Sequence, residues 1–135
     1  MQRILVIDDE LDVRDAIKRV LERAGYEVHT AESALEGITV MQSLETDVVI
    51  TDIIMPKVNG VEAITLIRQK FPQVRIVAIS GGGNFGLTAY QPNAITTTAY
   101  LAAAQKAGAN LVLTKPFESR DLVQAVQNVA LVGHA

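Results

Sequence analysis

The sequence predicts an α/β fold in which a parallel sheet carries helices on both faces. Short apolar runs rich in valine and isoleucine alternate with segments of helical periodicity, an order typical of this class. Four runs are apolar throughout, as in strands buried on both faces, and the second alternates, as in an edge strand. The five expected strands lie at about 3–7, 26–30, 48–51, 76–79 and 110–113. Because crossovers between parallel strands are right-handed, only a few doubly wound strand orders remain.

The helical segments carry their own start and stop signals. The first has one apolar face and ends before Gly25, a typical stop residue. The second opens with a capping-box pattern formed by Ser33 and Glu36. The side chains expected to point inward from this second helix are Leu35, Ile38 and Met41. A third helix follows Gly60, and a last helix is expected over about 119–131.

Length and composition limit the class of protein. A chain of 135 residues with no linker and no internal repeat is expected to form one domain, residues 1–135, without an output domain. Only 4% of residues are aromatic although 49% are hydrophobic, so the core must be aliphatic. The net charge of −3 argues against nucleic-acid binding, and the absence of cysteine excludes disulfides and thiolate metal sites. Neither a signal-peptide core nor a membrane-length apolar stretch is present, which predicts a cytoplasmic protein.

Polar residues close four of the expected strands. Asp8 and Asp9 follow the first, Asp52 the third, Ser80 the fourth and Lys115 the fifth. In a parallel sheet these strand ends meet at the carboxyl edge, where open α/β sheets bind their ligands. Because neighbouring parallel strands lie about 4.8 Å apart, Asp9 and Asp52 are expected to face one another there. Two carboxylates about 4 Å apart repel by roughly 4 kcal/mol at an effective dielectric near 20, so such a cluster either raises its pKa values or recruits a cation. Oxygen ligands alone favour Mg²⁺.

This set of residues suits phosphoryl transfer. A carboxylate such as Asp52 can attack a phosphoryl group, and the reaction needs mainly charge neutralisation and alignment. Lys115 offers a second positive charge, and the Ser80 hydroxyl can donate a hydrogen bond to a phosphoryl oxygen. The sequence therefore predicts an acyl-phosphate on Asp52.

The same residues carry a resemblance that spans the chain. The motif looks like the receiver domain of bacterial response regulators, and its parts are Asp8-Asp9, Asp52-Ile53-Ile54-Met55-Pro56 with Gly60, Ser80, and Lys115-Pro116-Phe117. The resemblance implies a flavodoxin-like sheet of order 2-1-3-4-5, for which a receiver domain is itself a standard example. It also implies that Asp52 accepts phosphate from a histidine kinase or phosphotransfer protein.

The resemblance assigns a role to each site residue. It implies that Asp9, Asp52 and the Ile54 carbonyl bind Mg²⁺ directly and that Asp8 helps through water. It implies further that Lys115 contacts the phosphoryl group and that its bond to Pro116 is cis.

The chain departs from the family pattern where the signal is read out. Val112 occupies the position, three before the lysine, where the family usually has an aromatic ring. The Ser80–Lys115 separation is about a dozen residues longer than usual, and the excess falls in a charge-free, glycine-rich stretch expected to enlarge the loop after the fourth strand. The face made by the fourth helix, fifth strand and fifth helix lacks the charged pairs of many dimeric relatives. An apolar surface for a downstream protein is therefore expected there.

Two other functions stay open beside the phosphoacceptor switch. One is a scaffold that keeps the receiver fold and binds partners without phosphorylation. Val112 and the long loop favour this alternative. The other is a phosphohydrolase of the haloacid-dehalogenase type. Those enzymes resemble one another in placing a second Asp two residues after the nucleophile, and here that position is Ile54. The glycine-rich stretch also matches G-x-G-x-x-G, but no acid lies between Glu62 and Glu118, so a flexible loop is favoured over a dinucleotide site.

Overall fold

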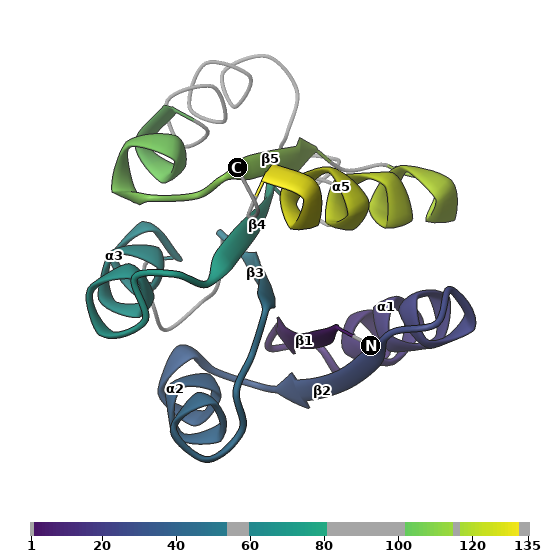
Figure 1. Cartoon of the computed structure of the whole chain (residues 1–135), viewed down its shortest axis with the longest axis horizontal. Coiled ribbons are helices and arrows are strands. Elements are labelled where there is room, and N and C mark those ends of the chain that lie inside the picture. Colours follow the sequence, from purple (N-terminus) through teal and green to yellow (C-terminus); the bar gives the residue numbers. More distant parts are fainter. Residues whose placement is uncertain (1, 54–59, 81–101, 115–116, 133–135) are drawn as a thin grey trace.

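Five parallel strands form one sheet in the order β2-β1-β3-β4-β5, which confirms the flavodoxin-like prediction (Figure 1). The computed structural model describes residues 2–53, 60–80, 102–114 and 117–132. The strands are β1 (Arg3–Ile7), β2 (Glu27–Ala31), β3 (Val48–Asp52), β4 (Arg75–Ser80) and β5 (Leu111–Thr114). Asp52 and Ser80, expected just beyond their strands, are the last residues of β3 and β4.

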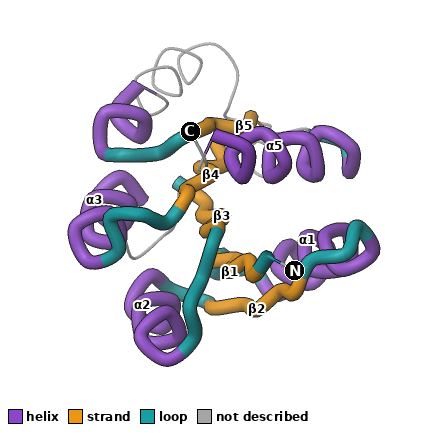
Figure 2. The backbone as a smooth tube through the Cα atoms, viewed as in Figure 1, coloured by secondary structure: helices purple, strands orange, loops and turns teal. Residues whose placement is uncertain are grey.

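Helices cover both faces of this sheet (Figure 2). The helices are α1 (Leu11–Arg23), α2 (Ala34–Ser43), α3 (Gly60–Lys70) and α5 (Ser119–Val132), and residues 102–107 are also helical. Helices α1 and α5 lie on one face, whereas α2, α3 and the 102–107 helix lie on the other. Within the described residues, no helix is both long enough and apolar enough to cross a membrane.

Alternation along the strands builds one core on each face of the sheet. Leu5, Val49 and Ile76 pack toward α2 and α3. Their neighbours Ile4, Ile50 and Val77 pack toward α1 and α5. All six side chains are at most 1% exposed, as expected for central strands of a parallel sheet. At about 25 cal/mol per Å² of apolar surface buried, these two layers are the main stabilising contribution and fix the strand ends that carry the polar residues.

Helix α2 shows one prediction confirmed and one wrong. The Ser33 Oγ accepts a hydrogen bond from the Glu36 N–H at 3.1 Å, so the predicted cap is present. Leu35, expected to point inward, is 73% exposed. The buried side of the helix is formed by Ala34, Gly37, Ile38 and Met41. Leu35 is one residue, or about 100° of helical rotation, from the buried Ala34, and the small Ala34 and Gly37 bring the helix close to β1.

Turns at the helix ends follow the sequence signals closely. Gly25 follows α1 with a φ of 102°, a left-handed conformation that glycine adopts without strain. Asn110, expected to begin the last strand, instead lies just before β5, where its side-chain oxygen accepts a hydrogen bond from the Ile76 N–H at 2.8 Å. The predicted enlarged loop at 81–95 and the cis bond between Lys115 and Pro116 lie outside the described residues.

Candidate functional site

The acidic residues gather at the carboxyl edge of β1 and β3, the two strands at the centre of the site. In the register of these strands the Cα of Ile7 pairs with that of Thr51, so Asp8 and Asp52 are the next residues along each strand. Asp8 is 2% exposed and Asp52 is 6% exposed. The register therefore aligns Asp8 with Asp52 and places Asp9, which was expected to face Asp52, one residue further out, where it is exposed.

Hydrogen bonds fix the backbone around Asp8. Its N–H donates to the carbonyl of Ala31 in β2 at 3.1 Å, and its carbonyl accepts from Arg14 Nη1 at 2.7 Å. Its carboxylate Oδ1 accepts from the Glu10 N–H at 2.9 Å, which turns the chain into α1. The side chain of Asp8 is thus held in one position by neighbouring strand and helix residues.

Three consecutive acids form a compact oxygen cluster at this edge. One carboxylate oxygen from each of Asp8, Asp9 and Glu10 lies within 4.8 Å of the others. Carboxylate oxygens at this spacing suit a hard divalent cation such as Mg²⁺ or Ca²⁺, so the donor set fits a metal. Glu10 was missed by the sequence reasoning, although its place directly after Asp8-Asp9 was the available signal. Among the described residues, this group does not include Asp52.

Asp52 is buried at the end of β3. The preceding Thr51 is 0% exposed, and its Oγ1 donates to the Asp52 carbonyl at 3.2 Å. The next N–H, that of Ile53, donates to the Ile79 carbonyl in β4 at 2.9 Å. The backbone on both sides of Asp52 is therefore fixed between β1 and β4, and little water reaches its carboxylate.

The remaining predicted site residues are only partly within the described structure. Ser80 ends β4, with its Cα paired to that of Thr114 at the end of β5, so its backbone lies at the same edge as Asp52. The Ser80 side chain, Ile54 and Lys115 lie outside the described residues. Val112 pairs with Ala78 and is partly buried against the core on the α2 and α3 face.

A second polar cluster lies away from this edge, on β1 and β2. Glu27 Oε2 lies 2.6 Å from Arg3 Nε and 2.7 Å from His29 Nε2. The hydrogen bond from Arg3, and then that from His29, hold the pKa of Glu27 below its usual value. His29 is half-buried beside Glu27. This cluster is structural, because it joins the edge strand β2 to β1.

Known proteins share this fold. A family model for the response regulator receiver domain matches residues 4–127. The chain is 32% identical over 130 residues to the chemotaxis protein CheY of Thermotoga maritima, covering 96% of this chain and 98% of that protein. It is 30% identical to the response regulator receiver protein CpdR of Brucella abortus, covering 97% and 98%. A solved receiver domain from Clostridium thermocellum superposes with a TM-score of 0.77 at 35% identity, covering 97% and 95%.

A five-stranded parallel sheet of order β2-β1-β3-β4-β5 with helices on both faces is the fold that the chain shares with this solved receiver domain. The chain belongs to the response regulator receiver domain family and is a protein of two-component signalling.

Proposed function

We propose that Asp52 accepts a phosphoryl group from a histidine kinase or phosphotransfer protein, and that the protein acts as a single receiver domain over residues 1–135. The observation that supports this is the register of β1 and β3, which brings the buried Asp8 and Asp52 to neighbouring strand ends. A poorly hydrated carboxylate beside other acids, on a rigid edge, is suited to nucleophilic attack on phosphorus.

In the proposed step, the imidazole of the donor histidine is the leaving group. An Asp52 carboxylate oxygen attacks the phosphorus of phosphohistidine, the new P–O bond forms as the P–N bond breaks, and the electron pair stays on the imidazole nitrogen. In this proposal Lys115 neutralises charge on the phosphoryl oxygens and Ser80 donates a hydrogen bond to one of them. The protein is then a regulatory phosphoacceptor working in the cytoplasm, and not an enzyme that turns over a separate substrate.

The metal in this proposal is Mg²⁺, bound by Asp9, Asp52 and the Ile54 carbonyl, with Asp8 acting through water. The compact oxygen cluster of Asp8, Asp9 and Glu10 supports a cation at this edge and adds Glu10 as an outer carboxylate. When bound, Mg²⁺ supplies positive charge that offsets the phosphoryl oxygens. The protein's own contribution is to hold Asp8 in place through the Ala31 carbonyl and the Glu10 N–H.

Labelling with a small phosphodonor such as acetyl phosphate tests this proposal. We expect Mg²⁺-dependent incorporation of phosphate that is lost in Asp52→Asn and on chelation. The exposed Asp15 on α1 provides a matched control, so Asp15→Asn should label like the wild type. Incorporation that survives in Asp52→Asn would rule out the assigned acceptor.

A constitutive scaffold is the second candidate, because the aliphatic Val112 is already packed against the core on the α2 and α3 face. The downstream protein is proposed to bind the face around β5 and α5. Partner binding by wild type and Asp52→Asn, each with and without phosphodonor, separates the two candidates. A switch responds to the donor only in the wild type, whereas a scaffold binds equally in all four samples.

A further inference from the structure

Charge is unevenly divided along the chain. Twelve of the fifteen acidic residues precede residue 53. Between Glu62 and Glu118 there are five basic residues and no acidic one: Arg68, Lys70, Arg75, Lys106 and Lys115. Because β4 and β5 lie at one side of the sheet and β2 and β1 at the other, the fold converts this sequence bias into a basic side and an acidic side.

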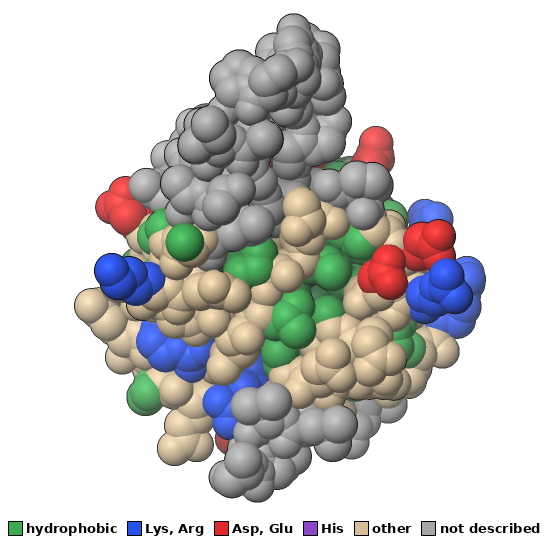
Figure 3. Space-filling view, turned by 90° about the horizontal axis from the view of Figure 1, so that it is seen from above, with side chains coloured by type: hydrophobic (Ala, Val, Ile, Leu, Met, Phe, Trp, Pro, Cys, Tyr) green, Lys and Arg blue, Asp and Glu red, His purple; other side chains and the backbone are tan. Residues whose placement is uncertain are grey.

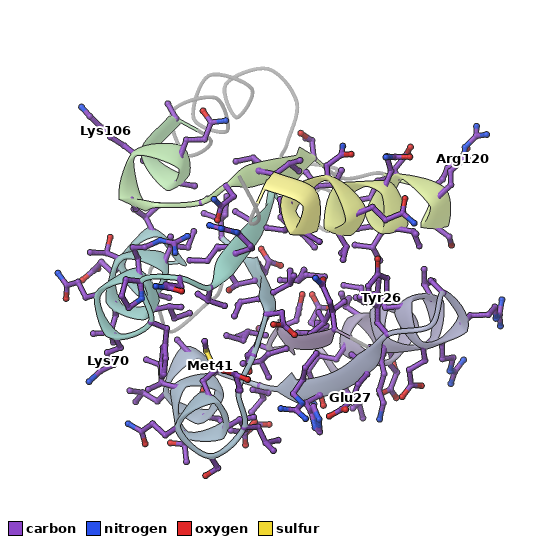
Figure 4. The ribbon with its side chains drawn as sticks, in the orientation of Figure 1. Tyr26, Glu27, Met41, Lys70, Lys106 and Arg120 are labelled. Carbon is purple, nitrogen blue, oxygen red and sulfur yellow. The ribbon has the colours of Figure 1, made fainter. Side chains whose placement is uncertain are left out.

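Four of these cations form a patch on α3, the start of β4 and the 102–107 helix. We name Arg68, Lys70, Arg75 and Lys106 the basic patch. Lys70 and Lys106 project from the same side of the molecule in Figure 4, and Lys and Arg side chains run across the left half of the face in Figure 3. Arg68 connects the elements, because its Nη2 donates to the Gly108 carbonyl at 2.8 Å. Burial and the nearby Arg75 charge lower the pKa of Arg68, so the two guanidinium groups are neighbours.

The positive charge of this patch is not neutralised within the described residues. The side chains of Lys70, Arg75 and Lys106 make no ion pair or hydrogen bond in that part of the chain. Arg68 donates there only to neutral acceptors, which are the carbonyls of Pro72, Val74 and Gly108 and the side-chain oxygen of Asn110. A concentrated positive field of this kind attracts a negatively charged partner.

A groove opens beside two of these cations, at the amino edge of the sheet. It has a volume of about 580 Å³, within the usual range of binding sites, and its lining includes Lys70 and Arg75. Its apolar lining includes Phe71, which is partly exposed, and the core residues Met41 and Val74, which are only 6% and 4% exposed. Met41 points from α2 toward α3 in Figure 4. Cations next to an apolar hollow can take carboxylates and one apolar anchor side chain together.

Two acids stand on the other wall of the groove. Glu45 and Asp47 line the groove on the side of the loop before β3. Asp47 Oδ2 accepts a hydrogen bond at 2.8 Å from the Arg3 backbone N–H, a neutral donor that leaves the charge of the carboxylate in place. The occupant is therefore oriented, with its negative charges on the α3 side.

We propose that the groove and the basic patch form a docking surface for an acidic segment of a partner protein. An apolar side chain of that segment packs against Phe71 in the groove, and its carboxylates lie over Lys70 and Arg75. The net charge of −3 and the acidic β1–β2 side disfavour nucleic acid as the occupant. The surface lies at the opposite edge of the sheet from Asp52, so it is separate from the proposed phosphorylation site.

A peptide-binding assay with the full chain tests this surface. The probe is a short, fluorescently labelled peptide rich in Glu and Asp with one central Phe, and its binding is measured by fluorescence anisotropy. We expect the double variant Lys70→Glu with Arg75→Glu to weaken binding by about tenfold or more. The matched control is Lys18→Glu with Arg19→Glu, the same charge change on α1, which should stay within about twofold. Replacing the central Phe of the peptide by Ala should also weaken binding. Circular dichroism checks folding, and Lys70→Gln with Arg75→Gln replaces the double reversal if it unfolds.

Three results would overturn the proposal. The first is equal weakening in the α1 control, or no weakening in the Lys70 and Arg75 variants. The second is tighter binding of random-sequence duplex DNA than of the peptide at the same salt. The third is a dimer of the wild-type chain in sedimentation that is lost in the Lys70 and Arg75 variants, which would assign the surface to a second copy. None of these results bears on phosphate labelling of Asp52.

Discussion

Arg68 is expected to stabilise the turn before β5, because its guanidinium joins two segments far apart in sequence. Nη1 donates to the carbonyls of Pro72 and Val74 at 2.9 and 2.5 Å. Nη2 donates to the Gly108 carbonyl at 2.8 Å and to Asn110 Oδ1 at 2.9 Å. The substitution Arg68→Met keeps an apolar stem of similar reach and removes all four hydrogen bonds. It therefore isolates the contribution of the guanidinium group.

The burial of each hydrogen bond sets the expected loss of stability. The bonds to Pro72 and Asn110 are exposed, so water replaces Arg68 there at little net cost. The bonds to Val74 and Gly108 are partly buried, and a hydrogen bond to a charged group contributes about 1.5–3 kcal/mol. Relief of the repulsion from Arg75 offsets part of this. Two such bonds together contribute about 3–6 kcal/mol, and the relieved repulsion reduces this sum. We therefore expect Arg68→Met to lower the free energy of unfolding by about 2–3 kcal/mol.

Urea denaturation measures this loss of stability. A lower midpoint, with an unchanged slope of the unfolding free energy against urea concentration, reports a change in stability. Arg19→Met, an exposed arginine on α1, is the matched control and should change the free energy by less than about 0.5 kcal/mol. Arg68→Lys keeps the positive charge but lacks the planar guanidinium group, so its free energy of unfolding should lie between those of the wild type and Arg68→Met. If Arg68→Met stays within about 0.5 kcal/mol of wild type, the guanidinium does not hold these segments together.

Two further substitutions test the packing of α2 and the charge cluster on β2. A Cβ at Gly37 would lie 2.7 Å from Ile7 Cδ1 and 3.3 Å from Leu5 Cδ2, both in the core. Gly37→Ala should therefore lower the free energy of unfolding by about 1–2 kcal/mol, although alanine has the better helix propensity. An increased urea midpoint would contradict this. Arg3 and His29 hold the pKa of Glu27 below its usual value near 4.5. Its contribution to stability is therefore complete above the unfolded pKa and is lost as pH falls through the lower folded pKa. In urea titrations across pH, the stability difference between wild type and Glu27→Gln should shrink on acidification below about pH 4.5, and a growing difference would refute the linkage.

The sequence alone determined the architecture and the location of the acidic edge. Unbroken apolar runs identified β1, β3 and β4, because strands buried on both faces admit almost no polar residue. Asp8 and Asp52 could be located in the same way, because charged residues appear where a buried strand reaches the edge of its sheet. The cap at Ser33 and the stop at Gly25 were also readable, because both depend on backbone groups within a few residues.

Only the tertiary structure decided which side chains meet. It exposed Leu35, aligned Asp8 with Asp52, and brought Glu10 into the oxygen cluster. It also joined Arg68 to Asn110 across forty-two positions of sequence and placed a groove beside Lys70. Local patterns report periodicity and strand ends, whereas these contacts depend on strand register and on helix rotation against the sheet. Register and rotation are set by packing of the whole core, so no short stretch of sequence contains them.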